Sequence, residues 1–469
     1  MTPRKILVCA PLLLLCAQLD AGDQPVEVVK LRVDPNTVLT RISGDFLGFG
    51  YETSAVAQSN FFSAKNATMV QLYRNLSPHG LIRIGGIISD HTQYVAEGTP
   101  AARTQRETTI INRTNLADLG DFARAAGWKV MWGLNLGTGS KDEAVAEAVS
   151  VEAALGSTLH SFQIGNEVEA LGRFARNYQA YHAAYLDYKS GVRVVLPDAP
   201  FSGPDSIGNL AWVTNFAAAE DRDMKLLTEH YYRGGANDPA TTLAKLLLHD
   251  DGWDNRLEKL RQICRDHGLA FRINEVNSFS GGGKPGVSDT FGSALWCLDY
   301  MFLLASYGCD GVNMETDVNQ LGFISHYSPI VHDAAGLCRA RPEYYGMLAF
   351  ATAGKGDLLK LTLDKTDINL SAYATRDDEG IIWITVVNKD FVRDAMVEAM
   401  LPAGYSSAAA FRLSAPSVES KDQVTLAGAE VASNGKWTSG PPEPVVAKDG
   451  VARLPVLHAS AVLLQLQHN

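Results

Sequence analysis

The sequence predicts an α/β protein in two parts: a (β/α)8 TIM barrel, and a C-terminal all-β sandwich that also takes up an N-terminal strand. Two observations lead to this prediction. Short, continuously apolar segments alternate with helical segments over the first two thirds of the chain, which is typical of a parallel sheet covered on both faces. After about Gly354 this alternation stops, and short strands separated by Pro, Gly, Ser and Asp follow.

Eight apolar segments are predicted as barrel strands, and a helix or a helical return follows each of them. They cover residues 46–51, 81–84, 129–134, 162–167, 192–196, 225–228, 271–275 and 310–314. Eight such units over roughly 300 residues fit a closed barrel better than an open sheet. No Gly-x-Gly-x-x-Gly motif or phosphate loop follows the first strand, so a dinucleotide-binding fold is disfavoured.

The strands predicted outside the barrel lie near the two ends of the chain. An alternating segment at residues 26–33 stops at Asp34-Pro35, and we expect it to pair with strands from the C-terminus. Residues 359–363, 370–374, 381–387 and 460–466 are the strands predicted there. The predicted divisions are a signal peptide at 1–22, an N-terminal strand at 23–40, the barrel at 41–353 and the β-sandwich at 354–469. No long low-complexity linker separates the domains, so we expect them to pack together.

The first two dozen residues are typical of a secretory signal. Arg4 and Lys5 form a basic start, an apolar run covers residues 6–17, and small residues follow. The run is too short to span a bilayer comfortably, which disfavours a membrane anchor. A lipoprotein attached through Cys16 is disfavoured because Leu15 stands where such signals usually carry a small residue. We therefore expect a secreted or periplasmic protein.

Composition excludes some classes of function. The formal net charge is −11 over 469 residues, which argues against a nucleic-acid-binding protein and, more weakly, against one that grips long sulfated polyanions. The four cysteines beyond the signal have no metal-ligand spacing. They are either buried thiols, which a core of this size favours, or they include a disulfide pair: Cys264, Cys297, Cys309 and Cys338. Nothing in the sequence indicates a metal or an organic cofactor.

Two carboxylates stand at the ends of predicted strands four and seven. Glu167 follows Asn166 after an apolar strand, and Glu275 follows a second apolar strand 108 positions later. These strands lie on opposite sides of an eight-stranded barrel, so their carboxyl ends face each other across the mouth where such barrels form active sites. Paired carboxylates about 5–5.5 Å apart suit retaining cleavage of a glycosidic bond. Glu167 is then the acid/base, and Glu275 is the nucleophile.

Neighbouring residues strengthen this interpretation. An isolated Glu at a strand end more often caps a helix or pairs with Arg, but an adjacent Asn166 amide can hold a sugar hydroxyl. The hydroxyl of Tyr232 can orient Glu275, whereas Tyr231 should point to the other side of the strand. His230 is either a structural histidine or a supporting residue of the site. The three glycines of the loop at residues 278–284 provide flexibility, or bring backbone N–H groups close to a ligand carboxylate.

These motifs resemble glycoside hydrolase family 79, which contains β-glucuronidases and heparanases. The resemblance rests on Asn166-Glu167, on His230-Tyr231-Tyr232 and on the run Glu275-Val-Asn-Ser-Phe-Ser-Gly-Gly-Gly-Lys-Pro-Gly-Val-Ser-Asp-Thr-Phe291. Ile82-Arg83-Ile84-Gly85-Gly86 with Asp90, and Gly48-Phe-Gly-Tyr-Glu52, agree with it. The similarity extends from about residue 25 to the C-terminus.

The resemblance implies retaining hydrolysis of β-linked glucuronic acid. It implies that Asn166 contacts the sugar 2-hydroxyl, that Tyr232 contacts the nucleophile and that Glu52 contacts a sugar hydroxyl. It also implies that the uronate is held by backbone amides near Gly281 and Gly282 and by the hydroxyl of Tyr327. Two positions depart from the family pattern: Ser280 stands where relatives often carry Tyr, and Ile87 where a polar residue is commoner.

The mode of action and two other classes stay open at this point. An endo-acting heparanase needs a cleft lined by Lys and Arg for sulfates, but residues 137–144 after strand three contain no basic cluster, which favours an exo enzyme. The expected partner is a glucuronic-acid-containing glycan or a glucuronide. A non-catalytic sugar-binding barrel is disfavoured because both glutamates and Tyr232 are present. An inverting or non-uronate glycosidase of the same clan is the remaining alternative.

Overall fold

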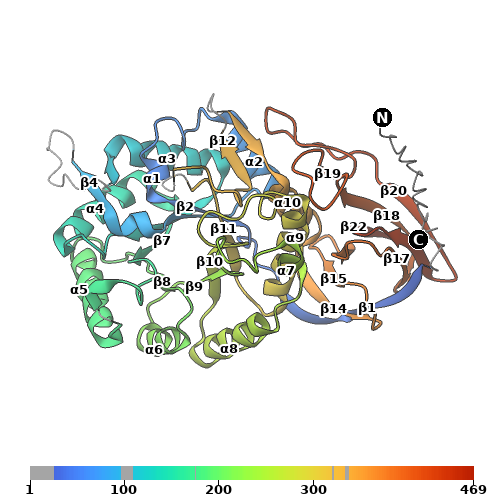
Figure 1. The fold of residues 1–469 in the computed structure, drawn as a ribbon. Helices are drawn as coiled ribbons and strands as arrows, with labels where there is room; N and C mark the ends of the chain where they lie inside the picture. Colours follow the sequence, from blue (N-terminus) through green and yellow to red (C-terminus); the bar gives the residue numbers. More distant parts are fainter. Residues whose placement is uncertain (1–25, 97–108, 175, 319–321, 333–336, 469) are drawn as a thin grey trace, which may run out of the picture.

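The computed structural model describes residues 26–96, 109–174, 176–318, 322–332 and 337–468, so the predicted signal peptide lies outside the described residues. Its main feature is a sheet of eight parallel strands with helices around the outside (Figure 1). The strands are β2 (Gly48–Glu52), β3 (Leu81–Gly85), β6 (Lys129–Leu134), β7 (Leu159–Ile164), β8 (Gly203–Ser206), β9 (Leu227–Tyr232), β10 (Phe271–Asn277) and β11 (Gly311–Glu315). The ring closes where Phe162 of β7 pairs with Phe201, just before β8. The predicted barrel is confirmed.

Helices follow the barrel strands and cover the outside of the ring. The longer ones are α2 (Ala67–Leu76), α3 (Arg113–Ala126), α4 (Lys141–Leu155), α5 (Tyr178–Val195), α6 (Leu210–Glu220), α8 (Asp251–His267), α9 (Phe291–Ser306) and α10 (Pro342–Ala353). Local sequence defines their ends: Asn112 and Ser140 form capping boxes at the starts of α3 and α4. Gly127 and Gly268 end α3 and α8 in the left-handed conformation that glycine adopts readily.

The strand predicted at residues 192–196 is wrong. Residues 192–195 are the last turn of α5, and the fifth barrel strand is β8, at Gly203–Ser206. The β-branched run around Val192 is typical of a strand, but Val192 is buried while Val194 is 82% exposed, as on one helical face. β8 was missed because Pro204, Asp205 and Ser206 carry no apolar pattern, although all of β8 is buried.

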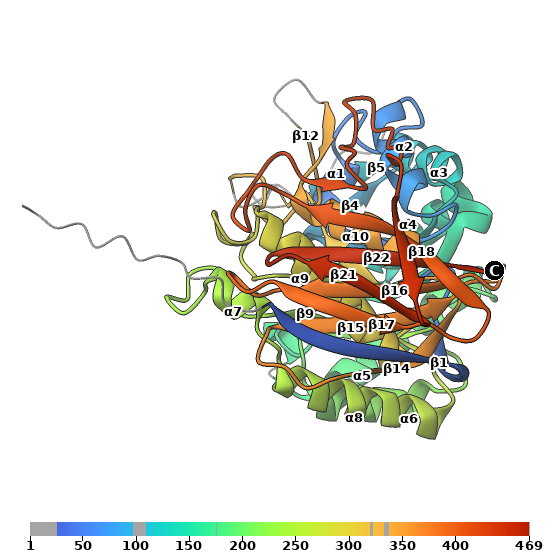
Figure 2. The ribbon, with the colours of Figure 1, turned by 90° about the vertical axis from the view of Figure 1, so that its right-hand side faces the viewer.

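The second domain is built around the N-terminal strand β1 (Glu27–Arg41). β1 lies between β14 (Asp357–Leu363), to which it is antiparallel, and β17 (Ala395–Met400), to which it is parallel (Figure 2). The other strands are β15 (Leu370–Arg376), β16 (Ile382–Asn388), β18 (Tyr405–Ser414), β19 (Thr425–Leu426), β20 (Glu443–Lys448), β21 (Val451–Val456) and β22 (Ser460–His468). The ten strands form one sheet that closes on itself where β18 pairs with β22. The expected partnership between the N-terminal strand and C-terminal strands is confirmed.

β1 is longer than predicted. It continues past Asp34-Pro35 to Arg41, because its register with β14 shifts between Asp34 and Val38 and again between Val38 and Thr40. Such irregularities absorb a proline without ending the strand. In its first half Val29, Leu31 and Val33 alternate with exposed residues and pack into the interior of the β domain.

The two domains are packed together through α9 and the residues around it. The backbone N–H groups of Phe291 and Gly292, at the start of α9, donate to the carbonyls of Ser420 and Val418 at 2.7 and 2.8 Å. Further along α9, Asp299 forms an ion pair with Lys389 at 2.5 Å. The β domain therefore supplies acceptors for N–H groups that a helix start leaves unpaired.

The described part of the chain contains four cysteines, and all four are buried free thiols, as predicted: Cys264, Cys297, Cys309 and Cys338. Two short additional sheets lie outside the barrel and the β domain, one formed by β4 (Thr92–Val95) with β5 (Thr109–Asn112) and one by β12 (Ile330–His332) with β13 (Cys338–Ala340). No helix among the described residues is long and apolar enough to cross a bilayer.

Truncating the buried face of β1 should destabilise the protein. Leu31→Ala removes a side chain that is 1% exposed between two neighbouring strands, so we expect a loss of about 2–5 kcal/mol in the free energy of unfolding. The matched control is Leu39→Ala on the same strand, because Leu39 is 53% exposed and its loss should change stability by less than about 0.5 kcal/mol. Urea-induced unfolding measures both, and equal effects would contradict the burial of β1.

Candidate active site

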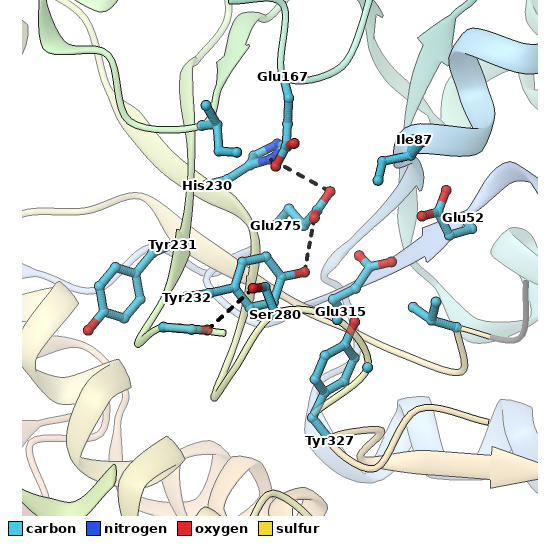
Figure 3. A pocket seen from close by; sticks show the side chains of 15 residues that line it. Glu52, Ile87, Glu167, His230, Tyr231, Tyr232, Glu275, Ser280, Glu315 and Tyr327 are labelled. Carbon is cyan, nitrogen blue, oxygen red and sulfur yellow. Dashed lines mark hydrogen bonds and ion pairs between the residues drawn. The ribbon is translucent and has the colours of Figure 1, made fainter. Parts of the chain in front are cut away.

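A pocket of about 390 Å³ lies at the carboxyl ends of the barrel strands. Most of its polar lining comes from residues at the ends of different strands, as Figure 3 shows. These residues are Glu52 of β2, Glu167 after β7, His230 and Tyr232 of β9, Glu275 of β10 and Glu315 of β11. Further lining residues include Gly281, Gly282 and Tyr327 from loops, together with Ile87, Ile207 and Val318. The carboxyl face of such a barrel is where active sites form.

The two predicted catalytic glutamates lie across this pocket from each other. A carboxylate oxygen of Glu167 and one of Glu275 lie within 4.8 Å of each other and of a ring nitrogen of His230. The imidazole lies between the carboxylates, with its Nδ1 at 3.3 Å from Glu167 and at 3.7 Å from Glu275. Glu275 is the more buried of the two, since its side chain is 11% exposed against 18% for Glu167.

The backbone at the end of β7 is held in an unusual conformation. Glu167 has a φ of 45°, in the left-handed region, which costs a non-glycine residue about 1–2 kcal/mol. Asp90 compensates by accepting the backbone N–H of Asn166 at 3.0 Å and those of Leu136 and Gly137 at 2.9 and 2.8 Å. Burial raises the pKa of Asp90 to about 7, although these three N–H groups act to lower it. The turn therefore directs the Glu167 side chain into the pocket.

Arg83 of β3 connects the site to the barrel interior. Its guanidinium is fully buried and donates to Glu275 at 2.7 Å, to Asp205 at 2.6 Å and to the side-chain oxygen of Asn166 at 2.5 Å. The oxygen of Asn166 thus accepts from Arg83, which directs its amide NH2 group to serve as a donor to a ligand. On the opposite side of the carboxylate, the Tyr232 hydroxyl donates to Glu275 at 2.9 Å.

The electrostatics of this group favour an ionised Glu275. Burial alone would raise its pKa, but His230 and Arg83 lower it below the usual value. Burial opposes the charge of His230, yet Glu275 and Asp205 raise its pKa well above the ordinary range. The Nε2 atom of His230 lies 3.1 Å from Asp205, which places the ring between two acidic neighbours.

Tyr231 points away from the site, as the alternation of a strand predicts. Its hydroxyl donates to Asp250 at 2.8 Å, and its ring stacks on Trp253. The predicted ligand contacts Glu52, Gly281, Gly282 and Tyr327 all line the pocket, and both glycines have positive φ angles of 77° and 84°. Ser280 and Ile87, which depart from the family pattern, line it as well.

Sequence reasoning missed four supporting acidic and basic residues. Asp205 escaped notice because β8 was not recognised, and Glu315 because the predicted last strand ends one residue earlier. Arg83 and Asp90 stand in a recognised motif, but only the fold shows that they contact Glu275 and Asn166. A charged residue inside an apolar strand, such as Arg83 between Ile82 and Ile84, is the signal that could have identified one of them.

Glu167, His230 and Glu275 also offer three potential metal ligands, since their ligand atoms lie within 4.8 Å of one another. A histidine ligates a metal through the lone pair of a neutral ring nitrogen. The raised pKa of His230 favours the imidazolium, which binds metals poorly and instead adds a positive charge between two carboxylates. The arrangement therefore suits acid–base and nucleophilic chemistry better than metal binding.

A parallel eight-stranded barrel with two facing glutamates at the ends of strands four and seven defines the class of (β/α)8 glycoside hydrolases. Residues 349–463 match the family model described as the glycosyl hydrolase family 79 C-terminal beta domain. The resemblance to glycoside hydrolase family 79 noted in the motifs is therefore confirmed for the C-terminal domain.

Two curated relatives carry the name beta-glucuronidase. The protein from Aspergillus niger is 25% identical over 346 residues, and the protein from Neurospora crassa is 25% identical over 378 residues. The alignments cover 66% and 70% of this chain but only 63% and 66% of those relatives' own lengths.

Solved structures share the fold. A 4-O-α-L-rhamnosyl-β-D-glucuronidase from Fusarium oxysporum superposes with a TM-score of 0.78 at 19% identity, covering 93% of this chain and all (100%) of that chain. A family 51 α-L-arabinofuranosidase from Bifidobacterium longum superposes with a TM-score of 0.70 at 12% identity, covering 94% of this chain and 99% of that chain. At these identities the likeness concerns the architecture alone.

Removing the buried cation should destabilise the protein in a pH-dependent way. Arg83→Met leaves Asp205 and Glu275 buried with less positive charge nearby, so we expect a loss of about 3–5 kcal/mol at pH 7. Both carboxyls have lowered pKa values in the folded protein. The stability that these two ionised carboxyls contribute to the folded protein is therefore present above the unfolded pKa values of about 4. It declines as the pH falls below those values.

Urea-induced unfolding at pH 7 and pH 3 measures this effect, and the difference between the variant and the unmodified protein should narrow at pH 3. Arg113→Met is the control, because Arg113 is exposed at the start of α3. Arg83→Lys retains the charge and should fold if Arg83→Met does not. A loss of stability that is equal at both pH values would refute the electrostatic account.

Proposed function

We propose that this chain is a retaining exo-β-glucuronidase, which removes terminal β-linked glucuronic acid from a glycan or a glucuronide. The observation that carries the proposal is the pair Glu167 and Glu275, whose carboxylate oxygens approach within 4.8 Å at one pocket. Retaining glycosidases hold their carboxyl groups about 5–5.5 Å apart, whereas inverting enzymes need about 6.5–9.5 Å to admit a water. The geometry thus supports a double displacement.

In the first step the ionised Glu275 attacks the anomeric carbon, while Glu167 donates its proton to the glycosidic oxygen and the leaving group departs. In the second step the Glu167 carboxylate takes a proton from water. The water oxygen attacks the anomeric carbon, and the bond to Glu275 breaks. Two inversions at one carbon retain the β configuration.

Each role fits the surroundings of its residue. Glu275 has a lowered pKa and is oriented by Arg83 at 2.7 Å and by Tyr232 at 2.9 Å, as a nucleophile requires. Glu167 is the more exposed carboxylate, which suits a group that exchanges protons with a leaving group and then with water. His230 touches both and would act as a positioning residue.

The uronate assignment draws on the relatives named beta-glucuronidase and on the glycine loop. Gly281 and Gly282 line the pocket beside Tyr327, where backbone amides and a hydroxyl can hold a carboxylate without a cationic side chain. None of the described residues that line the pocket is Lys or Arg, which supports exo action over an endo enzyme that grips sulfated chains. A non-uronate glycosidase is the second candidate, because a family 51 arabinofuranosidase shares the architecture.

We also propose that residues 1–22 are a cleaved signal and that the protein acts outside the cytoplasm. The proposed functional units are the N-terminal strand at 23–40, the barrel at 41–353 and the β domain at 354–469. A secreted glycosidase meets polymeric glycans directly, which fits the proposed substrate. N-terminal sequencing of the secreted protein would test the cleavage.

Azide rescue of alanine variants on an aryl β-glucuronide with a good leaving group tests the two roles. Glu167→Ala should lower kcat about 10²–10⁴-fold on substrates with poor leaving groups. Azide should restore turnover and give the β-glucuronyl azide. Glu275→Ala should stop turnover, and azide should then give the α-glucuronyl azide, because a single displacement inverts the anomeric carbon.

Glu152→Ala, at an exposed position of α4, is the control and should behave as the unmodified enzyme. The same enzymes are tested on an aryl β-glucoside and on a heparan chain whose length is followed. Preference for the glucoside would favour the second candidate, a non-uronate glycosidase. Shortening of the heparan chain would establish endo action and refute the exo assignment.

A further inference from the structure

Glu315, the last residue of β11, occupies an unusual position in the pocket. Its side chain lies between those of Glu52 and Glu275, as Figure 3 shows, and the residue is 2% exposed. Neither of its carboxyl oxygens has a hydrogen-bond partner in the described part of the chain. A buried carboxyl with both oxygens unpaired is rare, and it lines the space where a ligand would lie.

Glu315 is surrounded by charged and titratable groups from every strand that faces it. Glu52 approaches from β2, Arg83 from β3, His230 and Tyr232 from β9, Glu275 from β10, and Tyr327 from the loop after β11. Burial, Glu275 and Glu52 raise the pKa of Glu315 well above its usual value, while Arg83 and His230 act in the opposite direction. The two terminal guanidinium nitrogens of Arg83 donate their hydrogen bonds to Glu275, Asp205 and Asn166. These surroundings therefore favour the protonated form of Glu315.

A protonated carboxyl has an O–H donor to offer. The pocket also presents the carboxyl groups of Glu52, Glu167 and Glu275, and none of its described lining residues is Lys or Arg. An ionised Glu315 would add a further negative charge beside an anionic sugar, whereas a neutral Glu315 adds a donor. Figure 3 shows the ring of Tyr327 extending toward Glu315, so the acid lies beside the hydroxyl predicted to hold a uronate.

We propose that Glu315 is a specificity-determining residue that donates a hydrogen bond from its neutral carboxyl to the carboxylate of the bound sugar. This inference rests on the proposed function and gives it a mechanism of substrate selection. An O–H···O⁻ hydrogen bond is short and about twice as strong as a neutral one. Ionisation of Glu315 would replace that bond with repulsion, so selection for uronate over neutral sugar holds only while the proton is present.

The test is binding of two non-hydrolysable ligands, phenyl 1-thio-β-D-glucuronide and phenyl 1-thio-β-D-glucoside, measured by calorimetry from pH 5 to pH 9. In the unmodified protein the Kd of the glucuronide should rise about tenfold per pH unit once Glu315 ionises, with uptake of one proton on binding. Glu315→Gln should remove this dependence, because an amide N–H donates at every pH. Glu315→Ala should weaken glucuronide binding about 10- to 100-fold and change glucoside binding less than about threefold.

Glu343→Gln is the matched control. Glu343 of α10 is also a buried glutamate with a raised pKa, but it accepts a hydrogen bond from Asn277 and does not line the pocket. It should leave both affinities unchanged, and circular dichroism establishes that all variants fold.

The outcomes separate the two proposals. If the unmodified protein prefers the glucuronide but Glu315→Ala binds both ligands as before, the role of Glu315 is refuted and the proposed function stands. If Glu315→Ala weakens the glucuronide and the glucoside equally, Glu315 contacts a group that both sugars share and the proposal is wrong. If the unmodified protein does not prefer the glucuronide at any pH, both proposals fail.

Discussion

The buried guanidinium of Arg83 is the interaction on which the site depends. Glu275 and Asp205 lose their hydration inside the barrel. The free energy of desolvation must be offset by a cation and additional hydrogen bonds. Arg83 does this through three hydrogen bonds: to Asn166 just after β7, to Asp205 of β8 and to Glu275 of β10. A shift of any of these strands would leave a buried charge uncompensated, so the geometry of the site and the register of the barrel are linked.

This link explains which features could be read from the sequence. The apolar strands and the helical periods predict the barrel because burial on both faces demands them. Glu167 and Glu275 could be predicted because each follows such a strand directly. Asp205 could not, since its own strand is polar and is defined by contacts with Arg83 and His230 rather than by apolar burial.

The β domain shows a similar limit. Its strands β14, β15, β16 and β22 are apolar enough to be predicted, whereas β17 to β21 were missed. β17 and β21 alternate buried Ala, Val or Leu with more exposed residues, β18 buries three consecutive alanines, and β20 has no buried residue. Their positions become apparent only when β1 is placed between β14 and β17. Val192 gave the opposite error, because a helix that buries one side can contain the β-branched run expected of a strand.

The β domain also bears on the active site through α9. This helix begins at Phe291, a short segment after the glycine loop at residues 278–284, and its first N–H groups donate to the carbonyls of Ser420 and Val418. The chain that follows Gly281 and Gly282 is thus fixed by a domain none of whose described residues lines the pocket. Flexible glycines can position a ligand only if the chain on each side of them is rigid.

The position of β1 has a consequence for how the chain is made. β1 is synthesised well before β14, its first partner along the sequence, which begins at Asp357. At cellular rates of synthesis the ribosome needs roughly 15–60 s to reach that partner. During this interval the apolar face of Val29, Leu31 and Val33 has no sheet to join, and an unpaired strand of this kind favours aggregation. A holding chaperone, or delayed folding of the whole chain, would protect the nascent protein until the C-terminal strands are complete.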